Sequence, residues 1–147
     1  MSTSYKEFSE KVEKANTENR ILHFQTRQQF DTTRIINSVF PQNQLVVNTE
    51  HVDAVELCAA DIFDSLPITD ALIVYDSNFI RPAALERLYT IITQRKVQHL
   101  GIPAMTREIE YVNFPADVLT IIVDYGHGKL AQKMQSNNVN MTTLNLS

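Results

Sequence analysis

The chain has 147 residues, of which 44% are hydrophobic and 20% are charged. This length is typical of one domain and allows a buried core to form without disulfides or a metal. The net charge of -4 and the isoelectric point near 5.5 argue against a general affinity for nucleic acid or an anionic membrane surface, because no stripe of Lys and Arg is available to displace counterions.

Further features of the sequence predict a soluble, cytoplasmic protein. No apolar run approaches the roughly 18 residues of a membrane span, and the polar N-terminus lacks the apolar segment of a signal peptide. Cys58 is the only cysteine, so no internal disulfide can form. Its apolar neighbours favour a buried structural thiol over a nucleophile.

Residues 1–19 predict an amphipathic N-terminal helix. Tyr5, Phe8 and Val12 recur at helical spacing among many charged residues. Their narrow apolar stripe could pack on the body of the domain or on a partner protein.

Residues 20–135 have the pattern of an α/β domain. The apolar residues near 21–24 predict a first strand, and the polar stretch 25–33 separates it from a helical set of apolar residues at 35–40. Pro41 helps to end this helix.

The next part of the chain predicts one more strand and one more helix. Residues 45–47 form a short apolar run that is typical of a strand. Residues 51–66 are mixed in character but mainly helical, and Pro67 is expected to stop them.

The stretch from Ala71 to Arg95 is the most strongly patterned part of the chain. The β-rich run at 72–75 predicts a strand buried on both faces, as in a parallel sheet, and Asp76 follows at its carboxyl end. Pro82 suits the first turn of a helix, where its missing N–H costs nothing. One apolar face of that helix is formed by Leu85, Leu88, Tyr89 and Ile92.

A β-hairpin and another buried strand follow this helix. Residues 97–102 and 107–112 alternate between apolar and polar residues on either side of Pro103, which predicts the hairpin. Residues 118–123 predict a second fully buried strand, and residues 129–135 a short helix.

The Asn/Thr-rich tail, residues 136–147, suits an edge strand or a disordered end equally well. The alternation of strands and helices along the chain predicts a single α/β domain. We expect a mostly parallel sheet with helices on both faces and an inserted β-hairpin.

Functional groups in such sheets lie at the carboxyl ends of the strands. Asp76 and Asp124 end the two most buried strands, and neighbouring strands would bring their carboxylates close enough to hold Mg²⁺. His127 could then act as an acid or base at neutral pH. The alternative is structural: the two Asp residues cap the following helix or turn, and Gly126 and Gly128 supply the turn geometry.

The remaining histidines are weaker candidates. His23, His51 and His99 show none of the spacings that are typical of metal ligands. Each is expected to be an ordinary surface or core residue.

The order of these elements resembles the core of a P-loop ATPase of the AAA+ type. In this resemblance Ala71 to Asp76, with Arg81 to Arg95, is similar to the strand that ends in the acidic metal-binding motif and to its helix. Residues 97–112 are similar to the hairpin of the magnesium-chelatase-like branch, and Val118 to Asp124 to the sensor strand. The likeness covers roughly residues 20 to 125 and depends on pattern rather than on specific residues, Asp76 excepted.

The departures from this family concern its chemistry. Where the phosphate loop belongs, residues 26–33 read TRQQFDTT, with neither glycine nor lysine and only a hydroxyl residue at the last place. Such a backbone cannot easily wrap a phosphate, and Asp31 would repel one. Ser77 stands where the catalytic glutamate belongs. The resemblance thus implies a degenerate relative that neither binds ATP tightly nor hydrolyses it.

Two functional hypotheses follow. The first is a non-catalytic α/β protein-binding module, a small regulator or a subunit of a larger assembly, with no catalytic residues, no cofactor and a protein partner; assembly with further copies of itself stays open. The second is a metal-dependent enzyme or ligand-binding domain that acts on a phosphorylated small molecule through Asp76, Asp124 and His127, with Mg²⁺ bound by the two aspartates.

Overall fold

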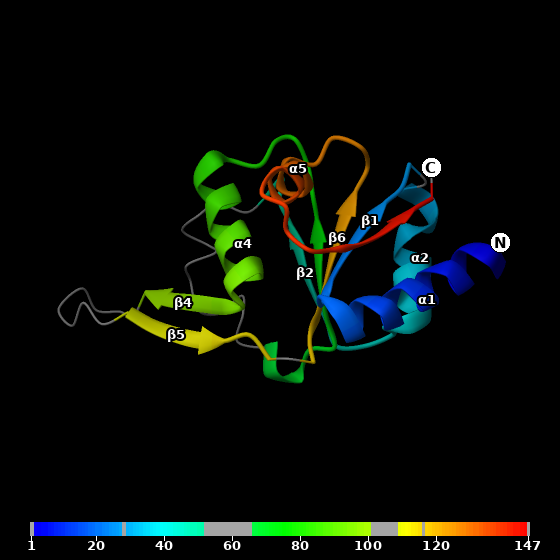
Figure 1. Ribbon diagram of the computed structural model, residues 1–147, viewed down its shortest axis with the longest axis horizontal. Helices are drawn as coiled ribbons and strands as arrows, with labels where there is room; N and C mark the ends of the chain where they lie inside the picture. Colours follow the sequence, from blue (N-terminus) through cyan, green and yellow to red (C-terminus); the bar gives the residue numbers. More distant parts are fainter. Residues whose placement is uncertain (1, 28, 52–65, 101–108, 116, 147) are drawn as a thin grey trace.

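A parallel sheet forms the centre of the molecule (Figure 1). The structure is a computed structural model that describes residues 2–27, 29–51, 66–100, 109–115 and 117–146. Its strands run in the order β2-β3-β6-β1-β7, and each neighbouring pair is parallel. The strands are β1 (Ile21–Gln25), β2 (Gln44–Asn48), β3 (Ala71–Tyr75), β6 (Leu119–Asp124) and β7 (Thr142–Asn145).

Helices cover both faces of this sheet, and Figure 1 shows the two layers on either side of it. One face carries the first two helices of the chain and the other face carries the two later ones. Their bounds are α1 (Ser2–Glu18), α2 (Gln29–Val39), α4 (Pro82–Gln94) and α5 (Lys129–Ser136), and a short 3-10 turn, η2 (Leu66–Ile68), precedes β3. The predicted α/β fold class is confirmed.

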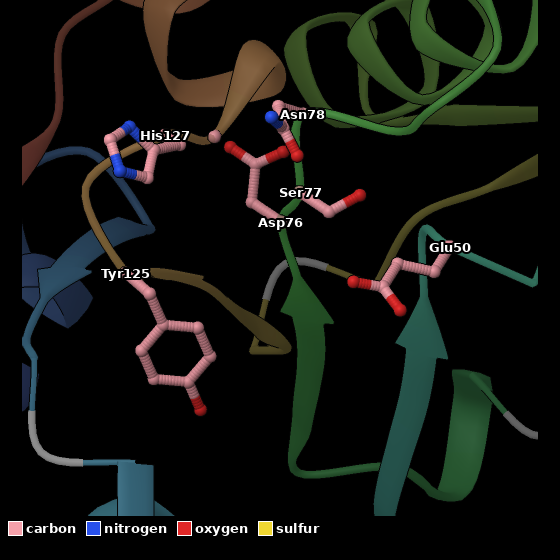
Figure 2. Close-up of a pocket in the computed structure, with 7 residues that line it drawn as sticks. Glu50, Asp76, Ser77, Asn78, Tyr125 and His127 are labelled. Carbon is pink, nitrogen blue, oxygen red and sulfur yellow. The ribbon is translucent and has the colours of Figure 1, made fainter.

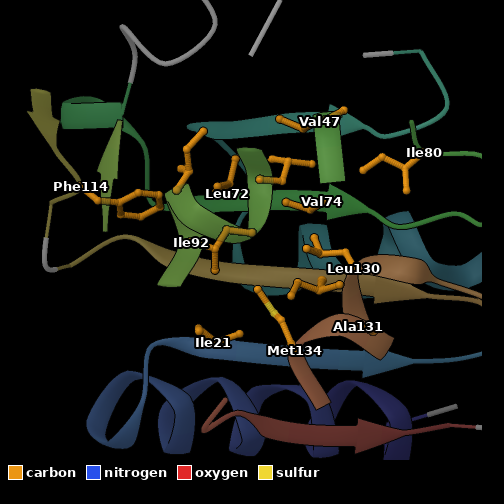
Figure 3. Packing of buried hydrophobic residues seen from close by; sticks show 14 of the residues in the cluster. Ile21, Val47, Leu72, Val74, Ile80, Ile92, Phe114, Leu130, Ala131 and Met134 are labelled. Atoms are coloured by element: carbon orange, nitrogen blue, oxygen red, sulfur yellow. The ribbon is translucent and has the colours of Figure 1, made fainter. Parts of the chain in front are cut away.

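The central strands are buried on both faces, which explains their continuous apolar sequences. In β3, Leu72 and Val74 pack towards α4 and α5 (Figure 3), whereas Ile73 packs on the opposite side. All six residues of β6 are buried. A strand with helices on both faces therefore shows no alternation of apolar and polar residues.

Helix α1 packs on the body of the domain through its apolar stripe. Phe8, Val12 and Ala15 are buried, and the Phe8 ring meets the Phe24 ring of β1 edge to face at 5.4 Å. The sequence left open whether this stripe packs on the body of the domain or on a partner protein. In the structure it packs on the sheet.

Helix α2 begins earlier than its apolar pattern suggests. It starts at Gln29, inside the stretch that the sequence favoured as a polar connection. Apolar spacing becomes visible only at Ile35 and Ile36, where the helix meets the sheet. Polar residues in a first helical turn leave no periodic signal, which accounts for the difference.

The predicted hairpin is present and lies beside α4. It consists of β4 (Lys96–Leu100) and β5 (Ile109–Asn113), paired antiparallel, and Figure 1 shows it to one side of the parallel sheet. The hairpin loop around Pro103 lies outside the described residues. Residues 52–65 also lie outside the described residues. They include Cys58 and all of the helix expected over residues 51–66 except its two end residues, His51 and Leu66.

Arg95 joins the end of α4 to the start of β6. Its backbone is left-handed, with φ 56°, and its N–H donates to the Ile91 carbonyl at 3.0 Å. The guanidinium donates to the Val118 carbonyl at 2.7 Å and to the Pro115 carbonyl at 3.3 Å. It also stacks 3.9 Å from the centre of the Phe114 ring.

The C-terminal tail supplies an edge strand. Strand β7 pairs with β1 from Leu22↔Thr142 to Gln25↔Asn145, and Leu144 is buried beneath α1 and α2. Within the described residues no helix is long and apolar enough to cross a membrane.

Candidate functional site at the carboxyl edge of the sheet

Asp76 caps a helix from a distant part of the chain. It follows β3 directly, and its two carboxylate oxygens accept hydrogen bonds from the backbone N–H groups of Leu130 and Ala131, at 3.1 and 2.8 Å. These groups belong to the first turn of α5, whose N–H groups have no partner within the helix. The carboxylate also lies at the positive end of the helix dipole. Asp76 therefore joins β3 to α5.

Gly128 allows this close approach. A Cβ atom at Gly128 would lie 2.0 Å from Asp76 Oδ2, well inside van der Waals contact. The absence of a side chain at Gly128 is thus what lets the carboxylate reach the helix.

Asp124 closes a turn and pairs with a buried histidine. Its Oδ1 accepts hydrogen bonds from the N–H groups of Gly126, at 2.8 Å, and Gly128, at 3.0 Å. Its Oδ2 lies 2.9 Å from His23 Nε2 in the neighbouring strand β1. His23 is only 1% exposed, and its Nδ1 has no hydrogen-bond partner among the residues that the structure describes.

The two carboxylates differ in their proton affinity. Burial raises the pKa of Asp76 to about 6, against the lowering effect of the Ala131 and Leu130 N–H groups. Burial also acts to raise the pKa of Asp124, but the His23 hydrogen bond and the two glycine N–H groups outweigh it and leave this pKa below its usual value. The negative charge of Asp124 adds to the rise at Asp76.

A hollow of about 150 Å³ opens beside Asp76 (Figure 2). In this view the Asp76 carboxylate lies between His127 on one side and Ser77 and Glu50 on the other. The residues that line the hollow are Glu50, Asp76, Ser77, Asn78, Tyr125, His127 and Gly128. Most of them carry oxygen atoms that accept hydrogen bonds, and none is Lys or Arg.

Hydrogen bonds hold Ser77, one of the lining residues, in place. Thr49 Oγ1 lies 2.8 Å from the Tyr75 carbonyl and 3.1 Å from Ser77 Oγ, which joins the ends of β2 and β3. The Lys129 N–H donates to the Ser77 carbonyl at 3.1 Å. The loop after β3 is thereby tied to both β2 and α5.

Tyr125 connects the end of β6 to α2. Its hydroxyl forms a hydrogen bond with Thr32, although burial still leaves the Tyr125 pKa above its usual value. Thr32 is itself buried. Only residues 26–28 connect β1 to α2, so the helix begins directly after the strand at the place where the family that the sequence resembles has its phosphate loop.

The structure thus brings Asp76 and Asp124 to the ends of adjacent strands, as the sequence predicted, with β3 paired to β6. His127 lines the hollow next to Asp76. The hydrogen bonds of Asp124 are those of the capping alternative, because it closes the turn that follows it. Asp76 also caps a helix, but this helix is α5 and not α4, which follows Asp76 in the chain. Among the described residues no group of three His, Cys, Asp or Glu side chains could hold a metal ion.

Three contributors were missed by the sequence: Glu50, the Tyr125–Thr32 contact and His23. His23 carried a signal, because Leu22 and Phe24 alternate with it, so it must face the other side of the sheet. Which residue it meets there depends on strand order, which no local pattern reports.

Comparison with known proteins supports the fold. No family model matches the chain, and no curated protein matches it. Among solved structures it is similar to NtrX from Brucella abortus in complex with ADP, with TM-score 0.57 and 11% identity over 95% of this chain and 32% of that one. It is likewise similar to NtrX in complex with ATP, with TM-score 0.59 and 9% identity over 92% and 33%.

The chain spans about a third of the length of these proteins. At this level of identity the likeness concerns the fold alone. It supports, at the level of fold, the P-loop-like resemblance that the order of elements indicated.

Proposed function

We propose that this chain is a non-catalytic α/β domain with a P-loop-like fold that acts by binding another protein, as a small regulator or as a subunit of a larger assembly. The hydrogen bonds of Asp76 and Asp124 serve to hold the domain together. Its outer surface provides the contact with the partner.

The observation that carries this proposal is the use of both strand-end carboxylates inside the fold. Asp76 accepts two helix N–H groups, Asp124 accepts two turn N–H groups and meets His23, and the two aspartates are 5% and 6% exposed. A carboxylate that binds Mg²⁺ must offer oxygen atoms to the ion, which usually also keeps several waters. These carboxylates are instead committed to protein donors.

The connection between β1 and α2 supports the same proposal. It has three residues, none of them glycine, whereas a phosphate loop needs a longer glycine-rich segment to surround a phosphate with N–H groups. Tyr125 also reaches from β6 to Thr32 on α2, next to this connection. A nucleotide phosphate would have to displace these groups. We infer that the nucleotide-binding chemistry of this fold is degenerate here.

The second candidate is a metal-dependent enzyme or ligand-binding domain for a phosphorylated small molecule, with Asp76, Asp124 and His127 in the site and Mg²⁺ on the aspartates. The hollow favours it, because His127 and Asp76 line the same space. A pKa of about 6 would also let Asp76 exchange a proton near neutral pH. The structural neighbours that hold ADP and ATP share the fold of this chain.

Thermal unfolding with ligands distinguishes the two candidates. The purified chain is heated alone and with Mg²⁺ or Mn²⁺, each with ADP, ATP or inorganic phosphate. A bound ligand at 100 times its dissociation constant stabilises the folded state by about 2.7 kcal/mol. The proposal expects no shift in the melting temperature with any combination. A shift that Asp76→Asn abolishes, and His127→Gln weakens, would establish the second candidate instead.

A further inference from the structure

We propose that the hollow beside Asp76, together with the exposed Phe79, is a docking site for a basic segment of a partner protein, in which an Arg or Lys side chain enters the hollow and an adjacent apolar side chain rests on Phe79. This inference depends on the proposed protein-binding function and names its surface and the chemistry of the partner.

The side chain of Phe79 is exposed to solvent, and the residues around it fix its backbone. Its side chain is 73% exposed, although Ile80, the next residue, is buried at 3%. Its N–H donates to Ser77 Oγ at 3.2 Å, and the Ser77 carbonyl accepts the Lys129 N–H. The backbone is therefore fixed before and after Phe79, while the aromatic ring of Phe79 contacts water. Rigid exposed aromatic residues are typical anchors of protein interfaces, because little conformational entropy is lost when they are covered.

The hollow has the charge that a basic group would need. Glu50 is exposed and makes no ion pair within the described part of the chain. Asp76 lines the same hollow, and although its oxygens accept the Leu130 and Ala131 N–H groups, it adds negative charge there at neutral pH. Ser77 and Asn78 add further oxygen acceptors to the lining. Lys129 and Arg81 are nearby in the chain, but neither lines the hollow. A guanidinium or ammonium group is complementary to this lining, whereas a phosphate is not.

The size of the hollow limits what can enter. At about 150 Å³ it is smaller than the roughly 300 Å³ at which clefts for drug-sized ligands begin. A space of this size suits the head group of one side chain. The remainder of a partner would have to lie on the surface outside, and Phe79 comes directly after the three lining residues Asp76, Ser77 and Asn78 in the chain. A peptide segment fits these requirements better than a free metabolite.

The test uses a defined peptide, acetyl-Leu-Arg-Leu-amide, and its neutral counterpart with citrulline in place of arginine. Each is titrated into the full chain while amide signals are followed by NMR. The arginine peptide should shift the signals of Ser77, Phe79 and His127 in a saturable manner, and the citrulline peptide should not. Phe79→Ser and Glu50→Gln should each weaken binding roughly threefold to fivefold, the value of one exposed aromatic or charge contact.

Ile68→Ser is the matched control, because Ile68 is also 73% exposed but precedes β3 at the opposite edge of the sheet. Its binding should equal that of the parent chain. The inference is overturned if the arginine peptide leaves these signals unchanged, if citrulline binds equally well, or if Ile68→Ser weakens binding as much as Phe79→Ser. Adding Mg²⁺ and ATP to the same sample distinguishes failure of this inference from failure of the proposed function. Shifts of amide signals around Asp76 would contradict the proposed function itself, whereas a peptide that does not bind refutes only the docking site proposed here.

Discussion

Gly128 shows how one residue can determine a distant contact. Its φ of -71° suits any amino acid, so the reason for glycine here is space and not backbone conformation. The added methyl of Gly128→Ala would press on the Asp76 carboxylate. We expect this variant to lower the free energy of unfolding by about 3 kcal/mol, as for other overpacked sites, measured by urea denaturation.

Gly126→Ala is the natural control for this prediction. No atom lies within 4 Å of a Cβ there, but φ is +106°, so its cost of about 1 to 2 kcal/mol would come from the backbone alone. In an Asp76→Ala background the cost of Gly128→Ala should fall, because the carboxylate is gone, whereas that of Gly126→Ala should not. If Gly128→Ala costs the same free energy of unfolding in both backgrounds, the added methyl group does not clash with the Asp76 side chain.

Asp76 should also make the stability of the protein depend on pH. Its pKa is raised from 3.8 to about 6, so the folded chain keeps a proton that the unfolded chain releases. The stability that this proton confers is fully present below pH 3.8 and is lost as the pH rises through 6. We expect the unfolding free energy of the parent chain, minus that of Asp76→Asn, to decrease by about 2 to 3 kcal/mol across this interval.

Asp124 provides the opposite case for the same series of urea titrations. Because its pKa is lowered on folding, its contribution is present above its usual pKa and is lost as the pH falls through the folded value. The difference between the parent chain and Asp124→Asn should therefore grow with rising pH. A difference curve for Asp76 that also grows with pH would contradict the assignment of the raised pKa.

At the scale of elements, Arg95 determines how α4 is attached to the sheet. Its guanidinium meets two backbone carbonyls and Thr120 Oγ1, at 2.7 to 3.3 Å, in a planar arrangement that lysine cannot reproduce. Arg95→Lys should therefore lower the unfolding free energy by about 1 to 2 kcal/mol, measured by urea denaturation. Arg81→Lys, an exposed arginine just before the same helix, should change it by less than about 0.5 kcal/mol. Equal effects of the two changes would show that the Arg95 contacts contribute little.

Elements with a strong local pattern could be predicted from the sequence, and those without one could not. Residues 71–75 and 118–123 are apolar, Thr120 excepted, because both faces of their strands are covered. Helix α4 begins at Pro82, a residue that suits a first helical turn. The residues at the start of α2 have no such pattern. The sequence of the tail suited an edge strand and a disordered end equally well. A four-residue strand acquires its order from pairing with β1, not from its own residues.

For the whole molecule, the position of each strand in the sheet predicts how firmly it is held. Strand β6 has hydrogen-bonded neighbours on both sides and six buried residues, whereas β2 and β7 each pair on one side within the described sheet. Amides of β6 should therefore exchange with deuterium most slowly, near the rate of global unfolding, and those of β2 and β7 faster. NMR detection of native-state exchange measures this. Exchange in β6 as fast as in β7 would refute the ranking.

The candidate site also depends on this long-range organisation. The sequence places Asp76 and Asp124 at strand ends, and any parallel sheet would bring both to one edge. The contact of Asp76 with the first turn of α5 and the pairing of Asp124 with His23 require a particular strand order. Composition and periodicity carry no information on that order, so the chemistry of the edge could be listed in advance but its internal pairing could not.

The place of β1 in the sheet has a consequence for synthesis of the protein. This strand leaves the ribosome before both of its hydrogen-bonded neighbours, which are β6, where Ile21 meets Thr120, and β7, which begins at Thr142. A nascent chain therefore carries an apolar strand with both edges open until β6 and β7 have also been made. Stalled chains in which residues 119–124 have not left the ribosome should be cut by protease near residues 21–25, and chains from which Asn145 has emerged should resist. Folding of this domain thus waits for its last strand, and nascent chains are exposed to aggregation or chaperone capture until that strand is available.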